Sequence, residues 1–426
     1  MEAVAQQPQV SSHFITAYSI AKNLAKEAIW SEDGRCNWQG ASLEPIEGQY
    51  QVVTRTFGTD LYSGLSGIAL FLAEIALRVS DPVIDRTLNG AIANILQQTQ
   101  EKPSPSAFGV YSGRMGTGYT LWKIGKLVKN DTWKKAGLDM MQELRKEAIG
   151  DHEIDIISGV ASAIPVLLKV HAEEGSTDLF DLAVKCGDFL LEKATKTASS
   201  WSWQTIPGNA GLTGYSHGAA GIALALLELY TQTQKSEYWV AAMRGFQYER
   251  EHFVPQQNNW PDLREEAGQS TTPQNRCCGE MWCHGAPGIA LSRLRAYQLT
   301  GDRNFLQEAQ LALDTTYKSV LKGLQNPASA SFCLCHGLAG NADILLTGAT
   351  WLNQPQYVQA AHHVGLLGYE LYEKTQTDWP SGVNDPTGKT NGMEPTPGLM
   401  LGSAGTGYFY LRLAYPKALD SLLLLN

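Results

Sequence analysis

Histidine recurs in front of glycine-rich motifs at three places in the sequence, and cysteine precedes it at two of them. The three stretches are FCLCHGLAGNADILL (332–346), MWCHGAPGIALSRL (281–294) and YSHGAAGIALALLEL (215–229). Thiolate and imidazole ligands of this kind favour zinc in tetrahedral coordination. Three protein ligands with an open fourth position would make the zinc catalytic, whereas four protein ligands would make it structural.

These stretches belong to a longer repeat, in which a small or polar residue precedes Gly-x-x-Gly, or a near match, and a mostly apolar run. Seven copies begin near residues 62, 111, 157, 216, 283, 335 and 400. The third copy is the weakest, because Ala161 and Ser162 stand where its second glycine would fall. Self-similarity at intervals of roughly 50 residues indicates one supersecondary unit used repeatedly.

Amphipathic segments alternate with these apolar runs. In TWKKAGLDMMQEL, the spacing of Trp133, Ala136, Met140, Met141 and Leu144 predicts one core-facing helical stripe. Similar segments start near Ala17, Asp85, Leu179, Tyr238, Phe305 and Tyr357. The sequence therefore predicts seven amphipathic helices that alternate with seven nearly all-apolar ones.

A helix that is apolar on every side must be buried on every side, so the motif helices are expected to form an inner layer. An open array of such hairpins would expose apolar faces at its ends, and neither terminus resembles a polar cap. We therefore predict an all-α fold, an α/α toroid of seven helical hairpins that forms one domain over residues 1–426. The glycines at the helix starts would allow close backbone approach and unusual φ values.

In a ring of repeats, equivalent positions lie around the same mouth. Cys283 and Cys335 are equivalent residues on adjacent inner helices, and His217, His284 and His336 follow one another in repeats four to six. Cysteine and histidine from neighbouring repeats should therefore converge at one end of the ring, and two matched pairs favour a metal site. The alternative is a pair of small buried cysteines with the histidines in a polar rim.

Composition excludes several other classes of function. The chain has 426 residues, 43% hydrophobic and 18% charged, with a formal net charge of −9. Without a basic surface, binding to nucleic acid or to an anionic membrane is not expected. No signal peptide or membrane-spanning run is evident, so we expect a cytoplasmic location. Seven cysteines in such a chain favour metal binding or catalysis over disulfides.

The motifs together resemble the lanthionine synthetase C-like cyclases over essentially the whole chain. The residues that carry the resemblance are LYSGLSGIALFL, Asp155-Ile-Ile-Ser-Gly159, SHGAAG, WCHGAPG, CHGLAGN and GLMLGSAGTGYFYLRL. The start of the chain and the WCHG motif are most similar to the cyclase half of fused, class II synthetases. No dehydratase half is seen, so we expect either a stand-alone cyclase or an excised domain.

The resemblance implies one zinc ion and the addition of peptide cysteine thiols to dehydroalanine or dehydrobutyrine, which forms lanthionine or methyllanthionine rings. The implied zinc ligands are Cys283, Cys335 and His336, and the implied acid–base residue is His217, with Asp155 close by. The implied partners are a dehydrated precursor peptide with a leader segment, a separate dehydratase and export machinery. The alternative is a relative that binds glutathione or adds it to dehydro residues.

The chain departs from the family pattern at two positions. The family often has an arginine four residues before the first zinc cysteine, where this chain has Gly279, and Arg276 could substitute for it. Many relatives have tyrosine after that cysteine, where this chain has His284, which is a candidate second proton-transfer group or a polar rim residue.

Several residues keep two interpretations. Cys333 could replace His336 in a three-cysteine site, although sharing a metal between positions i and i+2 is awkward. Asp155 could instead cap a helix, since it precedes Ser158-Gly159. Trp282 could pack beneath the metal or line a peptide groove. The other cysteines are interpreted as loop or structural residues: Cys277 and Cys278 in a loop, and Cys36 and Cys186 as structural residues, the latter on an outer helix.

Overall fold

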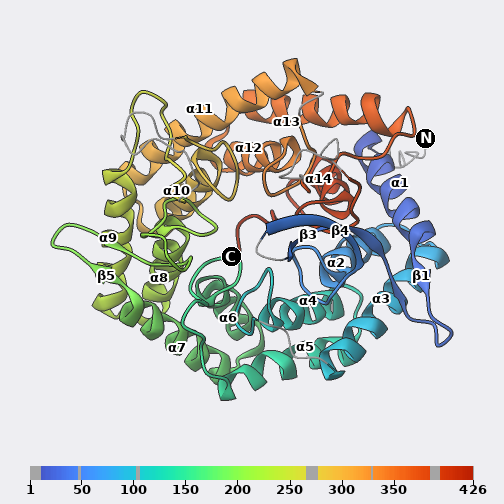
Figure 1. Ribbon diagram of the computed structural model, residues 1–426, viewed down its shortest axis with the longest axis horizontal. Coiled ribbons are helices and arrows are strands. Elements are labelled where there is room, and N and C mark those ends of the chain that lie inside the picture. The colour runs from blue at the N-terminus through green and yellow to red at the C-terminus, as the bar shows by residue number, and fades with distance from the viewer. Residues whose placement is uncertain are drawn as a thin grey trace, which may run out of the picture.

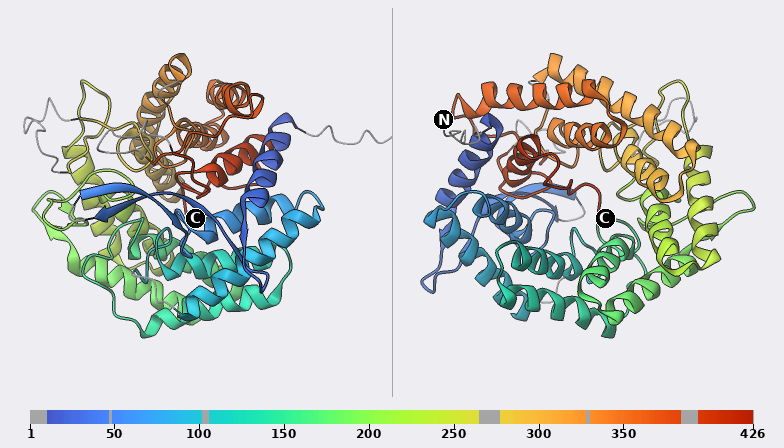
Figure 2. Two further views of the ribbon diagram at one scale, coloured as in Figure 1. Left: turned by 45° about the vertical axis from the view of Figure 1, so that its right-hand side comes forward. Right: turned by 180° about the vertical axis from the view of Figure 1, so that it is seen from behind.

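The computed structural model describes residues 11–46, 49–101, 106–264, 277–327, 330–383 and 394–425. Within these ranges, fourteen α-helices form two concentric layers that close into a ring (Figure 1). Figure 2 shows the ring from behind, with one set of helices around the centre and the other set outside it. The predicted α/α toroid is confirmed.

The inner layer consists of the seven motif helices. They are α2 (Leu65–Ala76), α4 (Arg114–Leu127), α6 (Val160–Glu174), α8 (Ala219–Thr233), α10 (Ala286–Thr300), α12 (Leu338–Leu352) and α14 (Ser403–Ala414). They are buried on nearly every side; in α12, for example, every residue from Leu338 to Ala349 is buried, including the polar Asn341 and Asp343. Burial on all sides is what the all-apolar pattern predicted.

The outer layer consists of the amphipathic helices. They are α1 (Ser12–Glu27), α3 (Pro82–Glu101), α5 (Asp131–Glu143), α7 (Thr177–Lys193), α9 (Ser236–Glu251), α11 (Arg303–Gln325) and α13 (Pro355–Gly368). A short 3₁₀ helix (Leu144–Lys146) follows α5, and a π-helical turn (Tyr369–Glu373) follows α13. Only one stripe of each outer helix is buried; in α11 this stripe includes Phe305, Ala309, Ala312 and Thr316. The stripe predicted around Trp133 is also present, with Met141 and Leu144 buried.

The ring closes through its first and last helices. Each inner helix from α2 to α12 packs against the outer helix that follows it in sequence, whereas α14 packs against α1. Inner helices also contact their neighbours all the way round, including α14 with α2. The open array that we considered from the sequence is therefore not formed, and no apolar end face has to be capped.

Each inner helix begins directly after the first glycine of its motif, which is the N-cap residue in all seven copies. Among these seven glycines, Gly285 has a positive φ of 92°, and a Cβ there would lie 1.7 Å from the carbonyl oxygen of Gly279. At the second glycine of the sixth motif, Gly340, a Cβ would lie 1.8 Å from the carbonyl oxygen of Leu334. Close backbone approach is thus the main reason for glycine at these positions.

Hydrogen bonds between equivalent positions join the seven turns into a closed belt around the ring axis. The belt consists of bonds of 2.7 to 3.2 Å: Trp282 N–H to Cys335 O, Cys335 N–H to Met400 O, Met400 N–H to Tyr62 O, Tyr62 N–H to Tyr111 O, Ser112 N–H to Ile157 O, Ile156 N–H to Ser216 O, and Ser216 Oγ–H to Cys283 O. Side chains at these positions therefore have fixed places relative to one another.

The C-terminal segment runs into the centre of the ring (Figure 1). The Tyr111 hydroxyl donates to the carbonyl oxygen of Leu422 at 2.6 Å, and Trp282 Nε1–H donates to that of Leu423 at 2.8 Å. Trp282 is completely buried, and its ring packs edge-on against Tyr111. Of the two interpretations of Trp282, packing beneath the site therefore agrees with the structure, because its indole has no face available to a groove.

Six short strands are additions to the predicted all-α fold. The longest pair, β3 (Gln39–Ile46) and β4 (Gln49–Thr56), forms an antiparallel hairpin that crosses one face of the ring near α2 (Figure 1). Two smaller ladders pair β1 (Ile29–Trp30) with β2 (Cys36–Asn37), and β5 (Thr195–Lys196) with β6 (Trp201–Ser202). The helical repeat gave no sign of them, because they lie in the connections between helices.

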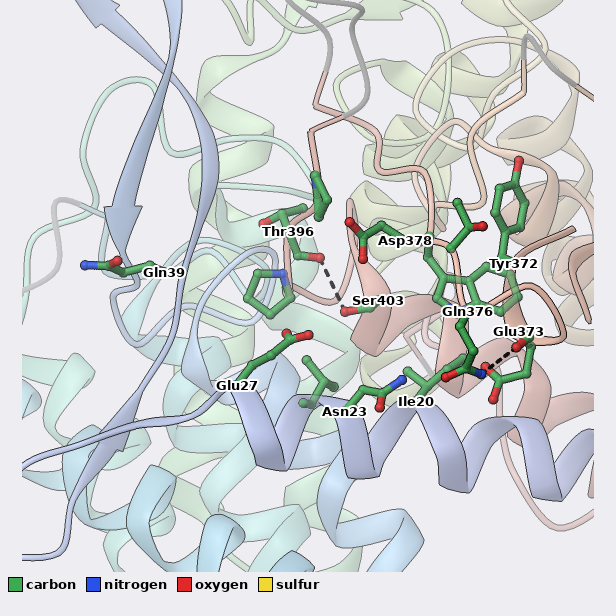
Figure 3. Close-up of a pocket in the computed structure, with 15 residues that line it drawn as sticks. Ile20, Asn23, Glu27, Gln39, Tyr372, Glu373, Gln376, Asp378, Thr396 and Ser403 are labelled. Carbon is green, nitrogen blue, oxygen red and sulfur yellow. Dashed lines mark hydrogen bonds between the residues drawn. The ribbon is translucent and has the colours of Figure 1, made fainter.

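A cavity of about 140 Å³ lies where α1 closes the ring (Figure 3). Its walls include Asn23 and Glu27 of α1, Tyr372 and Asp378 after α13, and Thr396. None of the residues that the sequence predicted for the site lines this cavity. In the described part of the chain, no helix is long and apolar enough to cross a lipid bilayer.

Candidate metal and acid–base site

Two cysteines and one histidine come together at the starts of α10 and α12. The potential ligand atoms of Cys283, Cys335 and His336 all lie within 4.8 Å of one another. Both cysteines stand two residues before the N-cap glycine of their helix, and the belt bond from Trp282 N–H to Cys335 O joins the two turns. The convergence expected from repeat symmetry is therefore present.

The neighbours of His336 suit a metal ligand. His336 Nε2 lies 3.0 Å from the carbonyl oxygen of Gly382, and because a carbonyl only accepts, Nε2 carries the proton. In the neutral ring that a metal ligand requires, Nδ1 then keeps its lone pair, and a histidine ligand is commonly oriented in this way by a backbone carbonyl. A Cβ on Gly382 would lie 2.7 Å from both His336 Nε2 and Cys333 Sγ, so glycine is required there. Two thiolates and one imidazole are a donor set that fits zinc.

The electrostatics of the three groups favour negative charge on sulfur. A hydrogen bond from Cys335 lowers the pKa of Cys283, and the charge of His336 lowers it further. The same hydrogen bond, together with burial, raises the pKa of Cys335. Burial opposes the charge of His336, but the neighbouring cysteines raise its pKa to about 11. The Tyr62 hydroxyl also hydrogen-bonds to Cys335. The site is thus arranged to hold a thiolate beside a positive charge.

Cys333 lies next to this group but outside it. Its thiol is buried, contacts His336 and lies 3.3 Å from Ser331 Oγ. The set that is close enough to share one ion contains His336 and not Cys333. A three-cysteine site therefore has less geometric support than the set implied by the family resemblance.

Asp155 and His217 form a close pair beside the metal-type group. His217 Nδ1 lies 2.6 Å from Asp155 Oδ2, while Asp155 Oδ1 accepts from the Ser158 N–H at 2.7 Å and the Ser158 hydroxyl at 3.0 Å. The N-cap of α6 is Gly159 and not Asp155, so Asp155 does not cap this helix. One of its oxygens instead binds the turn that leads into α6, and the other contacts the imidazole. Oδ2 accepts a hydrogen bond from Nδ1–H, so Nε2 is the nitrogen of His217 that is available for reaction.

The pair changes the acidity of the imidazole. Burial alone would lower the pKa of His217, but the hydrogen bond and the charge of Asp155 outweigh it and raise the pKa above 6.5. The negative charge of Cys283 raises the pKa of His217 further, so the imidazole interacts electrostatically with the metal-type group. His217 keeps part of its side chain exposed, 23%, so a substrate can reach it. A histidine with these properties can deliver a proton near neutral pH.

His284 lies beside His217, with a distance of 5.7 Å between the two ring centroids. It is buried, and burial lowers its pKa, so its ring is mainly neutral near pH 7. Its Nδ1 has no hydrogen-bond partner in the described chain and lies 3.6 Å from Asp262 Oδ1. The exposed polar rim that the sequence allowed for His284 is therefore not its environment.

Arg264, a residue that the sequence analysis did not single out, brings a further positive charge near His217 and His284. Arg276, the predicted substitute for the family arginine, lies outside the described residues. Arg264 instead binds Asp262 through both carboxylate oxygens, with Nε at 3.0 Å from each and Nη2 at 2.5 Å from Oδ2. Its charge lowers the pKa values of both His217 and His284. No motif marked Arg264, because it lies in a connection far from the WCHG motif in sequence.

The remaining cysteines do not join the site. Burial raises the pKa of Cys36 and of Cys186 to about 12, in agreement with the structural roles expected for them. Cys277 is exposed, and burial raises the pKa of the half-buried Cys278 to about 11.

The fold and the site together define a closed α/α toroid with a cysteine–histidine group and an adjacent carboxylate-bound histidine at the inner helix starts. The chain belongs to the lanthionine synthetase C-like protein family, whose match covers residues 56–424. The family that the motifs suggested is therefore confirmed.

Individual relatives are distant. The chain is 23% identical over 339 residues to the lacticin 481/lactococcin biosynthesis protein LcnDR2 of Lactococcus lactis subsp. lactis, which covers 77% of this chain and 33% of that protein. It is 22% identical over 356 residues to the nisin biosynthesis protein NisC of the same organism, covering 74% of this chain and 81% of NisC. The chain thus spans about a third of the length of LcnDR2.

Among solved structures, nisin cyclase is similar to this chain with a TM-score of 0.62 and 18% identity. The superposition covers 85% of this chain and 90% of nisin cyclase. At this identity, the likeness establishes the shared fold.

Proposed function

We propose that this chain is a zinc-dependent lanthipeptide cyclase, which adds cysteine thiols of a dehydrated peptide to dehydroalanine or dehydrobutyrine. The observation that carries the proposal is the Asp155–His217 pair beside Cys283, Cys335 and His336. Family membership supports it, since relatives are named for the biosynthesis of lacticin 481 and nisin.

Cys283, Cys335 and His336 are the proposed metal ligands. Zinc held there would supply a Lewis acid that lowers the pKa of a peptide thiol and keeps its sulfur nucleophilic near neutral pH. The carbonyl oxygen of Gly382 orients His336 by accepting a hydrogen bond from Nε2–H. The Tyr62 hydroxyl forms a hydrogen bond with Cys335.

His217 is the proposed acid of the reaction. When the peptide sulfur bonds to the β-carbon of the dehydro residue, the electron pair of the double bond moves toward the carbonyl, and Cα must then take up a proton. The His217 imidazolium gives that proton from Nε2, because Nδ1 is bound to Asp155. The proton lost by the thiol goes to solvent or returns to His217, so atoms balance and no group leaves.

Arg264 and Asp262 are proposed to support this step. The Arg264 side chain is 37% exposed and is held by Asp262 beside His284. A guanidinium in this place is suited to pair with the carbonyl oxygen, on which negative charge develops. His284, which is neutral and buried next to His217, is proposed to exclude water from the imidazole and to fix its ring.

The proposed partner is a dehydrated precursor peptide with a leader, supplied by a dehydratase that acts beforehand. The test uses the purified chain and a synthetic peptide that contains one dehydroalanine and one cysteine. Cyclisation removes one free thiol while the peptide mass stays constant. If the thiol count is unchanged and added glutathione forms adducts with the peptide, the alternative of a glutathione-adding relative replaces this proposal.

Two variants separate the proposed roles. Cys283→Ala should lose bound zinc and cyclisation together, because a ligand is removed. His217→Ala should keep zinc and lose roughly 10²- to 10⁴-fold in rate, the usual contribution of a general acid. Metal content by elemental analysis and thiol titration measure the two effects, and a metal-free His217→Ala protein would contradict the division of roles.

A further inference from the structure

A second cavity, of about 420 Å³, lies directly against His336. Its walls come from three elements: the turn before α10, the C-terminal part of α11 and the start of α12. They include Glu280, Met281, Ser319, Lys322, Asn326, Ser331, Leu338 and Asn341. This volume is in the range of pockets that bind small ligands, roughly 300 to 1,000 Å³.

The cavity and His217 flank the metal-type group in the order of the repeats. His217 precedes α8, Cys283 precedes the next inner helix α10, and Cys335 and His336 precede α12. The cavity lies beyond these, toward α11, and none of Asp155, His217 or Asp262 lines it. A peptide whose sulfur is at the metal group can therefore extend in two directions, toward His217 and into this cavity.

Asn341 forms a fixed part of the cavity wall. Its Nδ2 donates to the carbonyl oxygen of Glu280 at 2.8 Å, which ties the start of α12 to the turn before α10. The residue is only 5% exposed and its Oδ1 is covered by neighbouring atoms, so the amide shapes the wall and offers no polar surface to a ligand.

Two N–H groups at the start of α12 are already paired with the chain itself. The Leu338 N–H donates to the Ser331 carbonyl at 2.9 Å, and the Gly340 N–H donates to the Cys333 carbonyl at 3.2 Å. Polar side chains of Ser319 and Lys322 on α11 also line the cavity. Met281 and Leu338 add an apolar surface. This mixture suits a short length of polypeptide better than a single ion.

We propose that this cavity binds the residues of the substrate peptide that flank the reacting cysteine, an inference that rests on the proposed function. The cysteine arm of the peptide lies in the cavity beside His336, while the arm that carries the dehydro residue lies at His217. The cavity therefore selects which cysteines of a precursor can react, through the size of their neighbouring residues.

The test fills the cavity from α11. Ser319→Trp places a large side chain into it, and Lys318→Trp, on the neighbouring exposed position that does not line it, is the matched control. Both changes are made in the His217→Ala background, so that a fluorescent peptide with one dehydroalanine and one cysteine binds without turnover. Ser319→Trp should raise the Kd at least tenfold with unchanged zinc content, and Lys318→Trp should leave both unchanged. An unchanged Kd for Ser319→Trp, or a loss of its zinc, overturns the proposal.

Two further measurements keep the test decisive. If Ser319→Trp fails to fold, Lys322→Glu serves instead, because its exposed side chain can change without disturbing the core; an unchanged Kd would again overturn the proposal. A peptide with tryptophan beside its cysteine should bind at least tenfold more weakly, and one with tryptophan beside its dehydroalanine should bind nearly normally. The reverse order would show that the arms are misassigned. If the wild-type chain cyclises the peptide while both results are negative, only this inference fails; if it cyclises no peptide, the proposed function fails.

Discussion

Glu249 of α9 is a buried carboxyl group that holds the turn carrying His217. Its Oε1 accepts from the N–H groups of Gly214, at 3.0 Å, and of Ala220, at 2.7 Å, on either side of that turn. Burial raises its pKa to about 8, although the charge of Arg293 and the two N–H groups act in the opposite direction. In the folded chain the carboxyl group is therefore largely protonated at pH 7.

The effect on stability follows from the difference between this pKa and the ordinary value of 4.5. Because the pKa of Glu249 is higher in the folded chain than in the unfolded one, its contribution to the free energy of unfolding is fully present below pH 4.5. This contribution is lost as the pH rises from 4.5 through 8. At about 1.4 kcal/mol per pKa unit, the upper bound is about 5 kcal/mol. Structural relaxation reduces it, and we expect roughly 1 to 3 kcal/mol. Glu249→Gln cannot ionise and keeps a carbonyl oxygen for both N–H groups.

The assay compares the melting temperatures of the wild-type chain and Glu249→Gln at pH 5, 7 and 9. At pH 5 the melting temperature of the variant should be nearly the same as that of the wild type. At pH 9 the variant should melt several degrees higher than the wild type. Glu237→Gln, on an exposed position of the same helix, is the control, and its difference from the wild type should not grow with pH.

The opposite outcome has a definite structural meaning. Glu249 Oε2 and Arg293 Nη2 are both buried without a hydrogen-bond partner in the described chain. If Glu249→Gln melts below the wild type at pH 9, the carboxylate is ionised in the fold and is stabilised by Arg293. The argument from burial would then be refuted, because attraction between the charges would outweigh desolvation.

Three other changes test the site. Gly382→Ala should disturb His336 and weaken zinc binding roughly 10- to 100-fold, as losses of orienting contacts do, measured by competition with a chelator; unchanged affinity would contradict the required close approach. Asp155→Asn should lower the pKa of His217 and shift the acid-dependent limb of the pH–rate profile to lower pH, with zinc retained, and an unshifted profile would show that Asp155 acts only on its turn. Arg264→Gln should lower kcat by roughly 10- to 100-fold with little change in KM, since it acts on charge that develops during the reaction, and an effect on KM alone would instead assign it to peptide binding.

The sequence by itself determined the layers of the fold and the composition of the metal-type group. Helices that are apolar on every side must lie inside, and the N-cap glycines place Cys283, Cys335 and His336 at equivalent helix starts. The physical reason is that every repeat folds into the same local structure, so residues at equivalent sequence positions occupy equivalent places in the ring whatever the distant contacts are. The Asp155–His217 pair was proposed from the family resemblance, and the geometry supports it.

Only the tertiary structure decided which residues surround that group. Gly382 contacts His336 from 46 residues away, Asp262 binds Arg264 near His284, and the Leu423 carbonyl oxygen accepts from Trp282 from 141 residues away. These contacts follow no period and carry no motif, because each depends on where a connection or a terminal segment passes over a finished ring. The hairpin of β3 and β4 belongs to the same class, since its place is set by the turn near Pro397 that it covers. Repeat symmetry fixes what every unit shares, whereas the irregular segments between units can be placed only after the ring has closed.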